Sequence, residues 1–122
     1  MFFFENIVAY KKALSLVEAA YQITKRWPKS EQYSLTDQFH RSTTSIALNI
    51  AEGSSRSHKD FRHYLDIARG SCFESIAILT IAKNQKYLST EDFSTLYQQI
   101  EELTKIIQGL KKSLLWTVFC TL

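Results

Sequence analysis

The sequence predicts an all-α protein, an up-down-up-down antiparallel four-helix bundle, and three observations support this prediction. The 122 residues contain one proline and three glycines, which favours long uninterrupted elements over the frequent turns of an all-β chain. Apolar residues recur every three or four positions along four separate stretches, as in amphipathic helices. The stretches are joined by short connections, which make consecutive helices antiparallel neighbours. We therefore expect a single domain over residues 1–122.

The first two helices are predicted over about residues 5–26 and 31–54. The first ends before Pro28, because the residue that precedes a proline is pushed out of the helical region. The apolar face of the second helix also includes polar and small residues. The two faces comprise Ile7, Tyr10, Leu14, Val17, Tyr21 and Thr24, widened by Ala13, Leu16, Ala20 and Ile23, and then Leu35, Phe39, Ser42, Ile46, Asn49 and Gly53.

The third and fourth helices are predicted over about residues 58–87 and 91–116. Ser57 and Asp60 form a Ser-x-x-Asp capping signal at the start of the third helix. Their apolar faces comprise Phe61, Leu65, Ala68, Cys72, Ile76 and Leu79, and then Phe93, Leu96, Ile100, Leu103, Ile107, Leu110 and Leu114. At ~1.5 Å per residue, helices of this length extend ~30–45 Å.

The composition and the two ends of the chain predict a cytoplasmic protein without a membrane segment. The formal net charge of +3 permits an anionic partner without requiring one. Neither the start, with Phe2–Phe4, nor the apolar stretch 114–122 has the pattern of a secretion signal or the length of a membrane span. Cys72 and Cys120 lack the CxxC spacing of redox or metal sites, so we expect reduced structural thiols.

The sequence contains no motif for catalysis, a metal or a cofactor. A di-iron or di-manganese bundle needs Glu-x-x-His pairs, and His40, His58 and His63 have no glutamate three residues before them. His58 and His63 are five residues apart and would point to different sides of a helix, which is poor metal geometry. Glycine-rich phosphate loops and nucleophile elbows are also absent from the sequence. We therefore expect no catalytic residue, no metal ligand, no cofactor and no enzymatic activity.

A basic segment connects the second and third predicted helices. If the chain turns near Ser55, residues whose numbers sum to about 110 lie at the same height in an antiparallel pair. This register places Arg41 level with Arg69, and two arginines at one level repel each other unless an anion lies between them. The anion could be a carboxylate, from Glu74 or from another chain, or it could be a nucleic-acid phosphate. Both interpretations remain open.

Asn49, Glu52 and Gly53 interrupt the apolar face where the second helix ends, and we interpret them as a clasp between the second and third helices. Asn49 lies on the apolar face, where a single asparagine can fix the register of packed helices, provided that it forms a hydrogen bond. Glu52 is level with the start of the third helix and would accept a hydrogen bond from its first N–H groups or from Lys59. Gly53 would permit a left-handed helix end.

The chain has more apolar surface than one small bundle can bury. Leu48 lies outside the core face of the second helix, and both ends of the chain are apolar, with Phe2–Phe4 at one and Trp116–Phe119 at the other. Exposed apolar patches usually mark partner surfaces. We therefore expect a homo-oligomer in which Leu48 faces a neighbouring subunit.

Two segments, SIALNIAEGSSR (45–56) and KDFRHYLDIARGSCFE (59–74), carry a resemblance to a known family. Together with the stretch from Trp27 to Gln38 and with Gly109, they resemble the four-helix-bundle proteins encoded in intervening sequences of bacterial 23S rRNA genes. The resemblance extends over nearly the whole chain. It implies a bundle that assembles as a ring-like homopentamer and has no known catalytic activity.

The resemblance also implies contact with nucleic acid. The genes lie within rRNA, and a related branch, the accessory proteins of diversity-generating retroelements, binds reverse transcriptase and nucleic acid through a basic surface. The residues expected to contact RNA or DNA phosphates here are Arg41, Arg56, Lys59, Arg62 and Arg69. The alternatives are a solvated helix end at residues 56–62, and a protein-interaction scaffold or accessory subunit whose arginines serve the subunit interface.

Overall fold

The computed structural model describes the backbone of residues 1–121 and the side chains of residues 1–115. The chain forms α1 (Val8–Thr24), α2 (Leu35–Ser54), α3 (His58–Asn84) and α4 (Thr90–Thr121), with two short 3-10 helices, η1 (Phe3–Asn6) and η2 (Lys29–Glu31). No strand occurs among the described residues, so the prediction of an all-α chain with four helices is confirmed.

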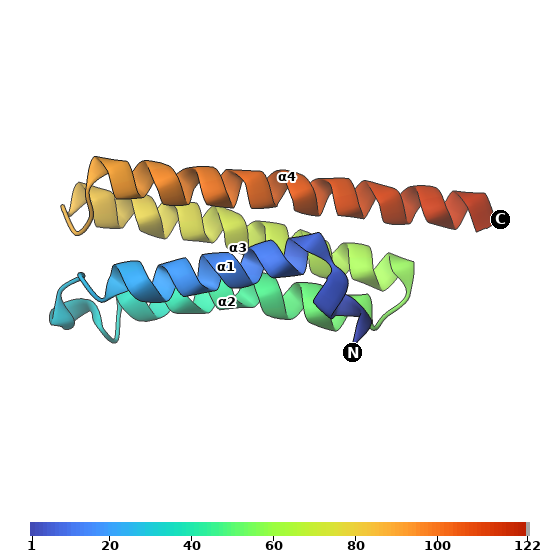
Figure 1. Cartoon of the computed structure of the whole chain (residues 1–122), viewed down its shortest axis with the longest axis horizontal. Coiled ribbons are helices and arrows are strands. Elements are labelled where there is room, and N and C mark those ends of the chain that lie inside the picture. Colours follow the sequence, from blue (N-terminus) through green and yellow to red (C-terminus); the bar gives the residue numbers. More distant parts are fainter. Residues whose placement is uncertain (122) are drawn as a thin grey trace.

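Consecutive helices run in opposite directions along one long axis (Figure 1). α1 packs against α2 and α4, and α3 packs against the same two helices, so the four helices surround one core. The pair α1 and α2 lies on one side of the bundle, and the pair α3 and α4 lies on the other (Figure 1). This arrangement leaves two outer faces that differ in chemistry, as described below.

The core is built from the apolar faces of all four helices. Its fully buried side chains are Leu16, Phe39, Ile46, Ile50, Leu65, Cys72, Leu79, Ile100, Leu103 and Ile107. In α3 and α4 these are residues that the apolar periodicity predicts, and in α2 so are Phe39 and Ile46, whereas Ile50 lies outside the predicted face and is nevertheless fully buried. The helices thus form where the sequence places them because burial of one apolar stripe per helix stabilises all four together.

The core face of α1 differs from the main predicted line. The buried residues are Ala9, Ala13, Leu16, Ala20 and Ile23, whereas Leu14 and Tyr21 of the predicted line are exposed. Three of these five residues are alanines, whose small side chains let the neighbouring helices approach α1 closely, so Leu14 and Tyr21 remain at the edge of the core. Choosing the core-facing side of α1 by its large apolar residues therefore gives the wrong set of buried residues.

The ends of the helices are set by local capping and turns. Ser57 Oγ accepts a hydrogen bond from the backbone N–H of Asp60 at 3.2 Å, which confirms the predicted cap of α3. α2 begins at Leu35 rather than near residue 31, because η2 and a turn precede it. α3 ends at Asn84 rather than near residue 87, and Lys86 adopts a left-handed conformation with φ of 65°.

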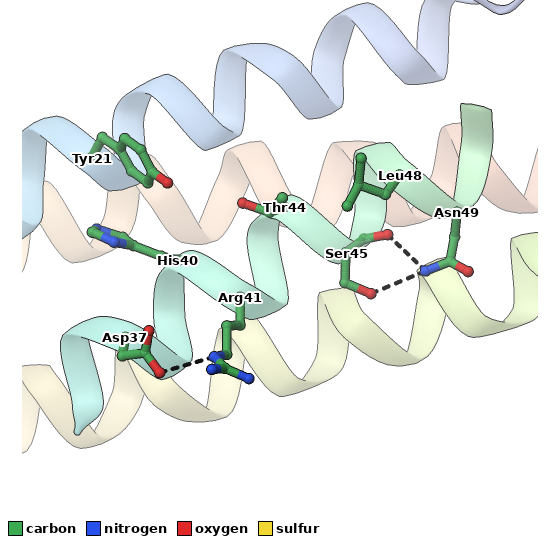
Figure 2. A pocket seen from close by; sticks show the side chains of 8 residues that line it. All are labelled: Tyr21, Asp37, His40, Arg41, Thr44, Ser45, Leu48 and Asn49. Carbon is green, nitrogen blue, oxygen red and sulfur yellow. Dashed lines mark hydrogen bonds and ion pairs between the residues drawn. The ribbon is translucent and has the colours of Figure 1, made fainter. Parts of the chain in front are cut away.

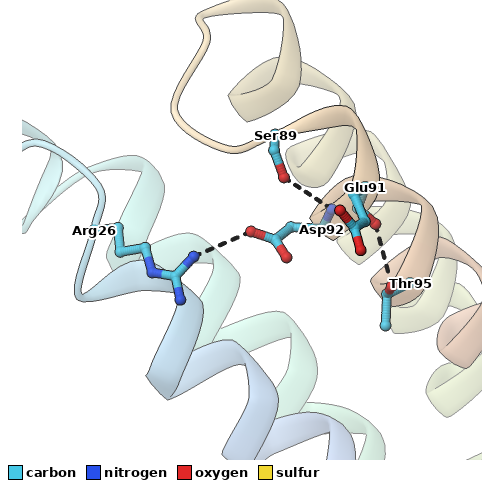
Figure 3. A network of polar contacts seen from close by, with 5 residues as sticks. All are labelled: Arg26, Ser89, Glu91, Asp92 and Thr95. Atoms are coloured by element: carbon cyan, nitrogen blue, oxygen red, sulfur yellow. Dashed lines mark hydrogen bonds and ion pairs between the residues drawn. The ribbon is translucent and has the colours of Figure 1, made fainter.

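Two exposed ion pairs connect α1 and the residues just after it to α4. Arg26, just after α1, reaches Asp92 with an Nη1–Oδ2 distance of 3.2 Å (Figure 3). In the same network Ser89 Oγ accepts from the backbone N–H of Asp92 at 3.0 Å and so caps α4 (Figure 3). A second pair joins Lys12 and Glu102 at 3.1 Å. These side chains are exposed to solvent, so each pair contributes little to the free energy of unfolding.

Candidate functional site

The contact between α2 and α3 is a line of small hydroxyl side chains. Ser42 Oγ and Ser75 Oγ are 2.8 Å apart, and Ser71 Oγ donates to Ser45 Oγ at 3.0 Å. Residues that face each other therefore have numbers that sum to about 116, rather than about 110. Side chains lean toward the N-terminus of their own helix, and in a hairpin this brings together residues that are both later in the chain.

The side chains of Arg41 and Arg69 consequently do not face each other, and the predicted meeting of the two arginines is wrong. Arg41 is 80% exposed on the outer side of α2, and its Nε atom pairs with Asp37 Oδ2 at 2.9 Å, one turn earlier. Figure 2 shows this pair beside Tyr21 and His40, whose rings lie close together, with centroids 4.1 Å apart. The anion beside Arg41 is therefore a carboxylate of its own helix.

Arg56 is also paired within its own segment. Its Nη2 atom donates to Glu52 Oε1, one turn earlier, and its guanidinium lies over the ring of Tyr64, 5.7 Å from the centroid. Glu52 thus receives Arg56 instead of Lys59 or the first N–H groups of α3, which corrects the predicted role of Glu52. A guanidinium held in this way has fewer donors free for a partner.

Gly53 does not form a left-handed helix end, and that part of the predicted clasp is wrong as well. It lies inside α2, is buried, and has no positive φ. A Cβ atom at Gly53 would lie 2.6 Å from Tyr64 Cβ and 2.8 Å from Phe61 Cδ1. The glycine is therefore required because α3 approaches α2 too closely for any side chain.

Asn49 is half-buried and its hydrogen bonds stay within α2. Its Nδ2 atom donates to the backbone oxygen of Ser45 at 2.8 Å and to Ser45 Oγ at 3.0 Å. Ser45 Oγ is the same atom that accepts from Ser71 of α3, so Asn49 acts on the helix contact through Ser45. The clasp between α2 and α3 is thus made by the serines and by Gly53, with Asn49 in support.

Arg62 and Arg69 differ from Arg41 and Arg56 in their polar contacts. They are seven residues apart on α3, which places them two turns apart on one face. Arg69 lies over the ring of Phe73, 4.7 Å from the centroid. Within the part of the chain that the structure describes, Arg62 Nη1 and Arg69 Nε are buried without a hydrogen-bond partner. Neither arginine forms an ion pair with a described carboxylate.

The lysines of α4 extend this basic region and were missed by the sequence analysis. Lys111 Nζ is 2.7 Å from Asp66 Oδ1 of α3, so the C-terminal half of α4 lies beside the N-terminal half of α3. Lys105 lines a groove with Phe73, the residue beneath Arg69. We define the α3–α4 basic surface as Lys59, Arg62, Arg69, Lys105, Lys111 and Lys112. The adjacent lysines Lys111 and Lys112 can be seen in the sequence. Their nearness to Arg62, however, follows only from the register of α3 with α4.

The thiol of Cys72 is packed in the core rather than available for chemistry. Burial raises the pKa of Cys72 to about 11, against smaller opposing effects of Thr104 and Arg69. The side chain of Cys120 lies outside the described residues. The described residues contain no group of three or more His, Cys, Asp or Glu side chains placed to hold a metal ion. Among them, no helix combines the length and apolar character needed to cross a bilayer.

Comparison with known proteins establishes the family. The sequence profile of the 23S rRNA-intervening sequence proteins matches residues 5–109. The chain belongs to this family. The match confirms the resemblance carried by residues 45–56 and 59–74. No curated protein is similar enough to match.

A solved relative supports the fold of this 23S rRNA-intervening sequence protein. It is a crystal structure of a protein of unknown function from the S23 ribosomal protein family of Bacteroides thetaiotaomicron VPI-5482. The two structures agree with a TM-score of 0.79 and 24% identity, over 86% of this chain and 99% of the other. At this identity the likeness concerns the fold alone.

The two segments that identify this 23S rRNA-intervening sequence protein pack against each other. Ser45 and Gly53 come from the first segment, and Tyr64 and Ser71 from the second. They meet through the serine hydrogen bond and through the close approach at Gly53. These segments therefore specify the α2–α3 contact, whereas the unpaired cations Arg62 and Arg69 lie on the other side of α3, toward α4.

Proposed function

We propose that this 23S rRNA-intervening sequence protein is a non-enzymatic homo-oligomer that binds RNA or DNA phosphates through the α3–α4 basic surface. The observation that carries the proposal is that Arg62 and Arg69, two turns apart on one face of α3, form no ion pair with a described carboxylate. A guanidinium with free N–H groups matches the geometry of a phosphate and can bind it in a bidentate manner.

The charges around the two arginines favour an anion. The α3–α4 basic surface has six cations, and two carboxylates lie beside it: Asp66, which is already bound to Lys111, and Glu101, which lines the same groove as Lys105. Arg41 and Arg56, by contrast, are each neutralised by a carboxylate one turn away. We therefore assign phosphate contact to Lys59, Arg62 and Arg69 of the expected residues, and add the three α4 lysines.

The test is a titration of fluorescein-labelled structured rRNA fragments over a range of salt concentrations, read by fluorescence anisotropy. Each phosphate contact contributes about 0.7–0.9 to the slope of log affinity against log salt. The triple variant Lys59→Ala/Arg62→Ala/Lys112→Ala should therefore reduce this slope by about 2–3. These residues lie at the surface or at its edge, so the fold should be retained.

The control is Lys25→Ala/Lys29→Ala/Lys86→Ala, which removes the same charge from exposed positions near the other end of the bundle. It should leave the slope close to that of the unaltered protein. An equal loss in both triple variants would contradict the assignment of the surface. Absence of binding at ~50 mM salt, where phosphate contacts are strongest, would contradict nucleic-acid binding itself.

The homo-oligomeric part of the proposal has separate support. Phe2, Phe3 and Leu48 are exposed, and Leu48 is 61% exposed on the outer side of α2. Phe2–Phe4, Leu48 and Ala51 line a mainly apolar hollow of about 610 Å³. Such a surface favours contact with another subunit. The family resemblance favours a ring of five.

A protein-interaction scaffold is the second candidate. Arg41 lines the same pocket on α2 as the exposed Leu48 (Figure 2). This placement favours a role for Arg41 in a contact between subunits or with a protein partner. The two candidates differ in what the α3–α4 surface binds, and the salt titration separates them.

A further inference from the structure

We propose that the groove between α3 and α4 docks an acidic amphipathic helix of a protein partner. Two adjoining hollows of about 370 and 410 Å³ share Tyr97 and Glu101, so they form one groove along the two helices. The groove extends from the level of Phe73 to the level of Lys83 on α3. Most of the groove lies outside the α3–α4 basic surface. The two regions meet at Arg69 and Lys105.

The floor of the groove is apolar and partly exposed to solvent. Phe73 is 54% exposed and Tyr97 is 38% exposed. Tyr97 packs on Phe93, with ring centroids 5.7 Å apart, and Ile76 lines the groove beside Phe73. Half-exposed aromatic side chains in a groove are typical of anchor sites for a partner's apolar residues.

The rim of the groove is basic. Arg69 lies over Phe73 at 4.7 Å, and Lys83 lies over Phe93 with its Nζ atom 4.5 Å from the ring centroid. Lys105 lines the same groove, and Glu101 is the acidic residue that lines it. Cations therefore border the apolar floor at both ends. The complementary ligand has an apolar stripe flanked by carboxylates, which is an acidic amphipathic helix.

The dimensions agree with a helix. The distance along α3 from Arg69 to Lys83 corresponds to ~21 Å, about four turns. A helix in this groove would pack on two antiparallel helices, as each helix of the bundle already does. Its apolar residues at positions i, i+3 or i+4, and i+7 would reach the floor.

Other occupants fit the groove less well. Bases that stack need free ring faces, but the rings of Phe73 and Phe93 already have cations over them. The apolar terminal segments of a second copy, residues 1–6 and 114–122, contain Glu5 as their one acidic residue. They therefore lack the negative charge that the rim would attract. The proposal does not require nucleic-acid binding, although the two sites share Arg69 and Lys105, and it gives the scaffold candidate a defined partner.

The test uses synthetic fluorescein-labelled 18-residue peptides with leucine at positions i, i+3 and i+7 or at positions i, i+4 and i+7, and with glutamate beside the leucine stripe. Matched peptides have lysine in place of glutamate. At least one acidic peptide should bind the full chain about fivefold or more tighter than its lysine counterpart at ~100 mM salt. Phe73→Ala and Tyr97→Ala should each weaken this binding about tenfold, because each removes an anchor contact.

Two controls separate the groove from the rest of the surface. Tyr33→Ala removes an aromatic side chain that is 90% exposed elsewhere and should leave peptide binding unchanged. Lys105→Glu should reduce the preference for acidic peptides while the apolar floor stays intact. Thermal unfolding of each variant shows that a loss of binding is not a loss of folding.

The outcomes also separate this proposal from nucleic-acid binding. Lys59→Ala/Arg62→Ala/Lys112→Ala should retain peptide binding, and Phe73→Ala should retain the salt dependence of RNA binding. Equal affinity for acidic and lysine peptides, or affinity unaffected by Phe73→Ala and Tyr97→Ala, would overturn the docking site. Displacement of a bound peptide by a 15-nucleotide single strand, with the same dependence on Phe73, would assign the groove to nucleic acid.

Discussion

At the scale of single residues, Gly53 determines how closely α2 and α3 can pack. Its position leaves no room for a Cβ atom, since Tyr64 Cβ and Phe61 Cδ1 would lie within 3 Å of it. Gly70 and Gly109 lie within helices too, but a Cβ atom there would meet nothing within 4 Å. Of the three glycines, Gly53 alone is required by packing, and the other two only lower helix propensity.

Alanine substitutions at two of these glycines should have opposite effects on stability. Gly53→Ala forces the helices apart and should lower the free energy of unfolding by about 1–3 kcal/mol. Gly70→Ala should raise it by about 0.5–1 kcal/mol, because it removes the conformational freedom of a glycine within a helix. Urea unfolding followed by circular dichroism measures both. A Gly53→Ala protein as stable as the unaltered chain would show that the close approach is not required.

At the scale of helices, the α1–α2 contact includes a histidine that can titrate. Thr24 Oγ1 donates to the backbone oxygen of Ala20 at 2.8 Å and also lies 2.8 Å from His40 Nε2. Either atom can donate in the Thr24–His40 contact, depending on the tautomer of the ring, and in both tautomers one ring nitrogen is left to take up a proton. Burial lowers the pKa of His40 below its ordinary value of 6.5, while Asp37 has a smaller opposite effect.

This lowered pKa predicts a loss of stability in mild acid. The folded protein holds the His40 proton less tightly than the unfolded chain, so stability is full above pH 6.5 and falls as the pH drops toward the folded-state pKa. His40→Gln retains a donor for Thr24 and cannot titrate. Its melting temperature should fall less between pH 7.5 and 5.5 than that of the unaltered protein. Equal falls in both proteins would assign the acid sensitivity to other groups.

Much of the helical architecture could be predicted because it depends on patterns within one helix, whereas contacts between helices could not. The spacing of apolar residues located all four helices, but the core line of α1 depends on small residues such as Ala13 that fit a close neighbour. The α2–α3 register depends on the direction in which side chains lean. For the site, the pairs Asp37–Arg41 and Glu52–Arg56 have a spacing of four that the sequence displays. The pairing of Asp66 with Lys111 needs the α3–α4 register.

At the scale of the whole molecule, the two outer faces have different chemistry. The α1–α2 face exposes Phe2, Phe3 and Leu48, and the α3–α4 face has the basic surface and the groove. The two helix pairs lie on opposite sides of the bundle (Figure 1). A subunit contact through the α1–α2 face would therefore leave the α3–α4 face available to a partner.

The division of faces makes a prediction about assembly. Leu48→Glu places a charge on the apolar α1–α2 face and should convert the proposed homo-oligomer to smaller species, because a buried unpaired carboxylate strongly opposes association. Ile81→Glu makes the same change at an exposed position on α3 and should leave the assembly intact. Light scattering after size-exclusion chromatography gives the mass of each protein. If Leu48→Glu left the mass unchanged, or if Ile81→Glu reduced it equally, the subunit contact would have to lie on another face.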